Sequence, residues 1–185
     1  GLMQEQARMD RAVATEPTSE AAGRVFEPGP EAVDMLAELY DEPAWMVDAR
    51  HDALNLYQEM PLPAQTDEAW RRTSLKKYPL DTTRLVFSPQ ELDGIYDIPP
   101  CWSYALAPVE QVSGVLVHCN GAHTYSTMRR DDEMNGVVFD DLHSALRDHS
   151  DLIREHWMRG TTTRPDFNKF TALNAALWHG GTFVY

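Results

Sequence analysis

The last eighteen residues constrain the fold most, because a helical pattern there runs directly into a β-prone one. Phe170, Leu173 and Leu177 recur at the three- and four-residue spacing of one helix face, with Asn174 as its one polar member. Residues 180–181 are both glycine, and a helix commonly ends on a residue that tolerates positive φ. The pattern predicts a helix that ends before this glycine pair.

The final residues, Thr182 to Tyr185, predict a strand. An isolated strand would leave backbone donors and apolar side chains without partners. Two interpretations follow. The strand docks into a small sheet of this domain, or Tyr185 stands near the first rung of a longer β structure.

The clearest β signal is a hairpin whose two-residue turn is Asn120-Gly121. Its strands are expected at Gly114–Cys119 and Ala122–Met128, with Cys119 opposite Ala122, His118 opposite His123 and Leu116 opposite Tyr125. Two facing imidazoles can bind a divalent metal, but a stable site needs a third or fourth ligand. Cys119 points to the other face, so a simple cross-strand histidine pair is the favoured interpretation.

Helices are expected on both sides of the hairpin. A short apolar stripe follows Pro30, and a longer helix begins at Pro43 and ends at Pro61. Their apolar faces are Val33, Leu36, Ala37 and Tyr40, then Trp45, Met46, Ala49, Ala53, Leu56, Tyr57 and Met60. Short strands are expected at Thr83–Phe87 and Val137–Phe139, with a proline-rich connection up to Pro108.

Three helices are expected after the charged turn Arg129–Glu133 and the Asn135-Gly136 break. The expected N-caps are Asp140 or Asp141, then Ser150, then Asp166. The expected buried sides are Leu142, Ala145 and Leu146 in the first, and Leu152, Ile153, His156 and Trp157 in the second. His143, His149 and His156 do not converge by spacing and are expected at or near the surface.

The charge of −13 argues against nucleic acid or an anionic membrane as a partner. Eight carboxylates and one cation, Arg50, fall between Glu31 and Glu59, which predicts a solvated helical face or a docking face for a basic partner. The basic residues Arg71, Arg72, Lys76 and Lys77 are expected to pair with that acidic face, and phosphate binding by them is the weaker alternative. No apolar run approaches the roughly 18 residues that span a bilayer, and the expected location is the cytoplasm.

Known catalytic and cofactor motifs are absent from the sequence, including GxSxG, the Walker loop, the dinucleotide fingerprint and HExxH. The two cysteines, Cys101 and Cys119, provide neither a disulfide framework nor a set of cluster ligands. We therefore expect no catalytic, cofactor-binding or metal site in these residues, and no enzyme. The predicted fold class is α+β, mostly helical with a small antiparallel sheet.

Three stretches carry a resemblance to a known family: Glu42–Pro63 (EPAWMVDARHDALNLYQEMPLP), Glu68–Leu75 (EAWRRTSL) and the ending ALNAALWHGGTFVY. They resemble the N-terminal part of the SufB/SufD iron–sulfur cluster assembly proteins, and EAWRRTSL is more similar to SufD. The resemblance implies a flexible leader over residues 1–28, an α+β domain over 29–180, and at 181–185 the first strand of a parallel β-helix core that this chain lacks.

The resemblance also implies a function. It predicts a scaffold subunit of the SUF complex that works with a SufC-type ATPase and a SufB or SufD partner through regions absent here, while the iron–sulfur cluster belongs to the full complex. The domain itself is then expected to pack on the β-helix or to receive a sulfur donor or a cluster acceptor. Two alternatives stay open: a metal-binding or redox enzyme that uses His118 and His123, and a stand-alone acidic adaptor that binds a protein.

Overall fold

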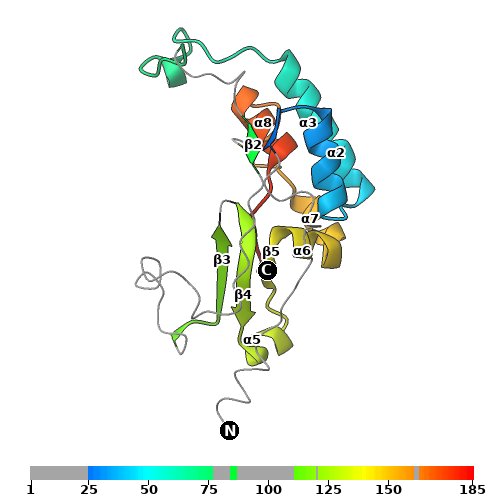
Figure 1. Cartoon of the computed structure of the whole chain (residues 1–185). Helices are drawn as coiled ribbons and strands as arrows, with labels where there is room; N and C mark the ends of the chain where they lie inside the picture. Colours follow the sequence, from blue (N-terminus) through cyan, green and yellow to red (C-terminus); the bar gives the residue numbers. More distant parts are fainter. Residues whose placement is uncertain (1–24, 77–83, 87–110, 120, 161–162) are drawn as a thin grey trace. The chain divides into compact units, whose positions relative to one another are not determined.

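The computed structural model describes residues 25–76, 84–86, 111–119, 121–160 and 163–185 (Figure 1). The leader before residue 25, Lys77, Cys101, Trp102 and the proline-rich connection lie outside these residues. The fold is α+β with small antiparallel sheets, as predicted. Among the described residues, two compact units can be distinguished. We call residues 25–86 with 149–178 the helical unit, and residues 111–148 with 179–185 the hairpin unit.

Two long helices and a third from late in the sequence form the helical unit. They are α2 (Pro30–Leu39), α3 (Ala44–Glu59) and α8 (Lys169–Leu177). Their common core contains Ala32, Val33, Leu36, Met46, Ala53, Leu54, Ala172, Ala175 and Ala176. Helices α3 and α8 pack together although more than 100 residues separate them in the sequence (Figure 1).

Shorter elements complete this unit. Strand β1 (Val25–Phe26) pairs antiparallel with β2 (Leu85–Val86), so the end of the expected leader is in a strand. A 3₁₀ turn, η1 (Glu68–Trp70), follows α3, and Trp70 stacks on Phe170 of α8 with 5.3 Å between the ring centroids. Helix α7 (Ser150–His156) buries Ile153.

The predicted helix at the end of the chain is confirmed, but its buried face is different. Leu177 is buried as predicted, but Phe170 and Leu173 are half-buried and Asn174 is exposed. The three alanines of α8 are buried instead. The buried positions of α8 hold alanine because a small side chain lets the backbones of two helices approach closely. A pattern of hydrophobic residues does not reveal this preference.

The N-cap predictions for the last two helices are wrong. Asn168, not Asp166, caps α8: its side chain accepts from the N–H groups of Phe170 and Thr171, and Thr171 completes a capping box. Asp166 pairs with Arg164 instead. His149 occupies the N-cap position of α7, and Ser150 is its first residue, with a hydroxyl that accepts a hydrogen bond from Trp45 at 2.9 Å.

The predicted hairpin forms the hairpin unit together with a second strand pair. Strands β3 (Gly114–Cys119) and β4 (Ala122–Met128) pair antiparallel. The ribbon of β5 (Phe139–Asp141) and β6 (Thr182–Val184) brings the end of the chain into the domain's own structure. Helix α5 (Arg130–Met134) replaces the expected charged turn, β5 begins two residues later than predicted, and α6 (Leu142–Asp148) follows β5 directly.

The hairpin register is correct near the turn and wrong beyond it. Cys119 lies opposite Ala122 and His118 opposite His123, as predicted. A register shift follows between Val117 and His118, so that Tyr125 pairs with Val117 rather than with Leu116. A β-bulge places one extra residue on one strand and moves every later pair by one position.

Gly180 and Gly181 are required because other atoms approach their backbone closely, and not because their φ angles are positive. Neither Gly180 nor Gly181 has positive φ, whereas Gly121 in the hairpin turn has φ +85°. A Cβ added to Gly180 would lie 1.8 Å from the carbonyl oxygen of Gly121, and one added to Gly181 would lie 2.9 Å from Leu142. The hairpin turn therefore rests against the backbone that leads into β6.

Candidate functional site

A polar cluster forms where the hairpin meets β5 and α6. His118 Nε2 lies 3.5 Å from Asp141 Oδ1, and the His118 and His123 rings meet edge to face with 6.2 Å between centroids. Asp141 Oδ2 accepts hydrogen bonds from the backbone N–H groups of His143 and Ser144, both at 3.1 Å. Asp141 thus caps α6, one of the two caps predicted there, and also contacts the hairpin.

Burial and neighbouring charges set the protonation of this cluster. Burial by itself would raise the pKa of Asp141, but the His118 contact, the nearby His143 and the Ser144 N–H together hold that pKa below its ordinary value. Burial lowers the pKa of His123 and raises the pKa of Asp140. At neutral pH the cluster therefore holds a carboxylate at Asp141 beside a neutral imidazole at His123.

The cluster does not assemble a metal site of ordinary composition. In the described part of the chain, no group of three or more His, Cys, Asp or Glu side chains is arranged to hold a metal ion. Cys119 is buried, and His123 Nε2 is buried without a hydrogen bond in the described residues. His143, expected at or near the surface, is 3% exposed. His156 is exposed, which agrees with its place among the surface histidines and not with its place on the buried side of α7. The backbone N–H of His143 donates to the buried Asp141 carboxylate, so His143 lies in the buried first turn of α6.

A second polar site, in the helical unit, is absent from the sequence-based prediction. Arg50 is completely buried, and its guanidinium pairs bidentately with Glu42, with N–O distances of 2.7 and 2.6 Å. Its Nη1 donates to the carbonyl oxygens of Ala176 at 2.9 Å and Trp178 at 3.0 Å, and the guanidinium lies 4.4 Å from the centroid of the Trp178 ring. We call these residues the Arg50 network.

The Arg50 network joins α3 and the residue Glu42 before it to the end of α8. Carbonyl groups at a helix C-terminus lack partners within the helix, and a cation there also interacts favourably with the helix dipole. Lys169, at the start of α8, makes the reciprocal contact with α3: its Nζ donates to the carbonyls of Tyr57 and Met60 at the end of that helix. A spacing signal for Arg50 exists, because it falls with Met46 and Ala53 at i, i+4 and i+7 on the buried face.

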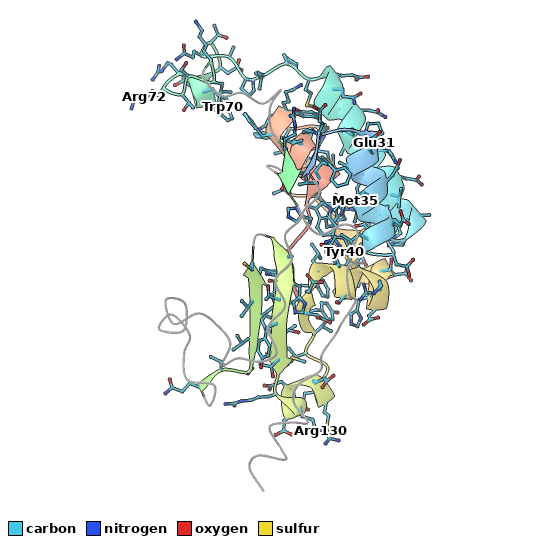
Figure 2. The ribbon with its side chains drawn as sticks, viewed as in Figure 1. Glu31, Met35, Tyr40, Trp70, Arg72 and Arg130 are labelled. Carbon is cyan, nitrogen blue, oxygen red and sulfur yellow. The ribbon has the colours of Figure 1, made fainter. Side chains whose placement is uncertain are left out.

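The outer surface of α2 and α3 keeps the predicted acidic character (Figure 2). Of the eight carboxylates between Glu31 and Glu59, the side chain of Glu42 is buried. The other seven are exposed: Glu31, Asp34, Glu38, Asp41, Asp48, Asp52 and Glu59. The predicted pairing with the basic segment is not seen in the described residues, where Arg71 forms an ion pair with Glu68 at 3.5 Å. Glu68 and Arg71 are three residues apart, so their side chains meet without any contact between distant parts of the chain.

The end of the β5–β6 ribbon exposes large apolar side chains. Val184 is 66% exposed and Tyr185 is 69% exposed, and Met134 and Val137, which precede β5, are also exposed. The backbone of Tyr185 makes two hydrogen bonds of 2.9 Å to Val138, which extends the ribbon by one pair beyond β6. Contiguous exposed apolar surface is typical of a surface that another protein segment, of the same chain or of a partner, covers.

These features define an α+β domain with a tightly joined helical unit and an exposed apolar ribbon at its end. Residues 34–185 match the family model of the SufBD protein N-terminal region. The chain therefore belongs to the SufBD family and corresponds to its N-terminal region. None of the helices among the described residues is long and apolar enough to cross a membrane.

Several curated relatives are similar over most of this chain. It is 31% identical over 163 residues to the iron–sulfur cluster assembly protein SufB of Bacillus subtilis, covering 84% of this chain and 34% of that protein. It is 31% identical over 154 residues to an iron–sulfur cluster assembly SufBD family protein of Mycobacterium tuberculosis, covering 78% of this chain and 17% of that protein. The chain spans about a third or less of the length of these relatives.

Proposed function

We propose that this chain is the N-terminal interaction domain of a scaffold subunit in an iron–sulfur cluster assembly complex, and that it is not itself an enzyme. The names of its relatives support a role in iron–sulfur cluster assembly. The family match over residues 34–185 is the observation that carries the proposal. Val184 and Tyr185 present apolar surface that a following segment of a longer chain or a partner subunit would cover in the assembled complex.

The partners follow from the same proposal. A SufC-type ATPase and a second SufB or SufD subunit would bind regions of a longer protein, and the growing cluster would be held there as cargo. The domain itself would receive a sulfur donor or a cluster acceptor in the cytoplasm, without a cofactor of its own. The EAWRRTSL segment favours a SufD-like subunit.

The geometry supports the two alternative functions less. A metal-dependent enzyme would need more than His118 and His123, and Asp141 is already engaged in capping α6. An acidic adaptor would use the seven exposed carboxylates between Glu31 and Glu59, which a solvated surface explains equally well. Stoichiometric zinc, iron or manganese in purified protein would favour the enzyme over the scaffold.

The test uses the full-length scaffold, co-expressed with its ATPase and partner subunit. Val184→Asp places a charge on the ribbon end, and Phe167→Ser is the matched control because Phe167 is a 57% exposed apolar residue in the helical unit. If the ribbon is covered in the complex, the charge forfeits about 1.5–3 kcal/mol of apolar burial and leaves a buried carboxylate.

We expect Val184→Asp to reduce the yield of intact complex and its cluster content, while Phe167→Ser leaves both near the wild-type level. Circular dichroism of the isolated subunit separates this effect from misfolding, because Val184 is largely exposed in the domain and its replacement should leave the domain folded. Equal behaviour of the two variants in complex assembly would contradict the interaction role of the ribbon.

A further inference from the structure

The segment that follows η1 is a basic island in an acidic protein. Between Ala69 and Lys76 there are three cations, Arg71, Arg72 and Lys76, and no carboxylate, although the whole chain carries a charge of −13. The Trp70 ring is fixed against α8 by its stack on Phe170. The island therefore starts from an anchored residue, and Figure 2 shows Arg72 beside Trp70 at one end of the helical unit.

The side chains of the island are open to solvent. Arg71, Arg72, Thr73 and Ser74 are all exposed, and Leu75 is half-buried. After a turn at Arg71 and Arg72, residues 73–75 belong to no helix or strand. The ion pair between Arg71 and Glu68 joins side chains that are 59% and 83% exposed, so it contributes little and is easily broken. An enzyme could therefore draw these residues into its own groove as an extended peptide.

We propose that Ser74 is a phosphorylation site for a serine/threonine protein kinase whose peptide groove is acidic. Charge patterns in the substrate direct kinases to their sites, and two arginines placed two and three residues before a hydroxyl suit a groove lined with carboxylates. Leu75 supplies an apolar residue directly after the hydroxyl. Thr73 is also exposed, but it lies one residue closer to the arginines and is followed by the polar Ser74.

The reaction is an ordinary phosphoryl transfer from ATP. The Ser74 oxygen forms a bond to the γ-phosphorus, the bond from that phosphorus to the β–γ bridging oxygen breaks, and ADP leaves. The hydroxyl proton passes to the catalytic carboxylate of the kinase. The product gains roughly −1.5 to −2 charges, which lie beside Arg72 and Lys76 and neutralise most of the island.

The test incubates the full-length protein with ATP and the catalytic subunit of a kinase that prefers arginine before serine, and locates phosphate by mass spectrometry. We expect one phosphate, on Ser74. Ser74→Ala should abolish its incorporation, and the matched control Thr73→Ala should not. Arg71→Ala with Arg72→Ala should lower kcat/KM by about tenfold or more, because two charge-assisted contacts are lost.

Phosphate on Thr73 or elsewhere, or no incorporation, would overturn the proposal, as would an unchanged kcat/KM in the double arginine variant. Circular dichroism confirms that each variant is folded, which the exposure of all four residues leads us to expect. Protein isolated from its source cells with phosphatase inhibitors should carry one phosphate on the same residue. Unmodified Ser74 in growing and stationary cells alike would also count against the proposal.

Discussion

Replacing Glu42 by alanine should destabilise the helical unit more than any surface change on the same helices. The substitution leaves the Arg50 guanidinium completely buried, and its remaining partners among the described residues are two backbone carbonyls and the Trp178 ring. Breaking a buried ion pair by removing one partner costs about 3–5 kcal/mol, because the remaining charge stays out of water. For a chain of this size, that loss corresponds to a fall in Tm of about 6–20 °C.

The complementary variant Arg50→Met should also destabilise the unit, since it removes the Arg50 cation from the buried Glu42 carboxylate. The double variant Glu42→Leu with Arg50→Met removes both charges and replaces them with apolar groups. Such replacements are often neutral, but here the carbonyls of Ala176 and Trp178 also lose their donor, at about 1–3 kcal/mol for each unsatisfied group. We therefore expect the double variant to be less destabilised than the sum of the single ones.

Urea denaturation followed by tryptophan fluorescence measures these free energies. Four of the chain's five tryptophans belong to the helical unit, so most of the signal reports on the unit that contains the Arg50 network; they are Trp45, Trp70, Trp157 and Trp178. Asp48→Ala is the matched control, because Asp48 is an exposed carboxylate on α3 and should change the free energy by less than about 0.5 kcal/mol. A loss below about 1 kcal/mol for Glu42→Ala would refute the view that this pair is buried and tightly coupled.

Three further changes test local features. Asn168→Ala should cost about 1 kcal/mol by removing the N-cap of α8, whereas Asp166→Ala should be nearly neutral; urea midpoints compare the two. Gly180→Ala should cost about 1–3 kcal/mol or more, since its Cβ would collide with the Gly121 carbonyl, and an unchanged Tm would contradict this packing. Burial lowers the pKa of His123 in the folded state, so the unfolded state binds the proton first as pH falls below about 6.5, and the free energy of unfolding declines. His123→Asn should flatten that decline between about pH 7 and 5, which urea midpoints measured across this range would show.

Periodicity and turn chemistry were enough to predict most of the described elements. The three- and four-residue spacing identified α2, α3 and α8, and Asn120-Gly121 identified the hairpin. These signals are local, because a helix face or a two-residue turn is specified by residues close together in the sequence. The resemblance to the SufBD family likewise rested on contiguous motifs, and the family match confirms it.

What the sequence did not predict depends on partners far along the chain. Arg50 is buried because its acceptors include Ala176 and Trp178, more than 120 residues away. The hairpin bulge shifted the pair at Tyr125, and a two-residue turn carries no information about a bulge several residues later. Asn168 displaced Asp166 as the cap because the last helix begins three residues later than Asp166. The polar cluster at Asp141 was missed for the same reason, since it requires the contact between the hairpin and β5.

The two cations of the helical unit explain why α3 and α8 form one structure despite their distance in sequence. Arg50 on α3 binds the carbonyls at the end of α8, and Lys169 at the start of α8 binds the carbonyls at the end of α3. This reciprocal arrangement requires the two helices to run antiparallel and to lie close together, which the buried alanines of α8 permit. A larger side chain at Ala176 would separate the helices and carry its carbonyl away from Arg50. Packing and hydrogen bonding are therefore coupled in this unit, and a change in either should weaken both.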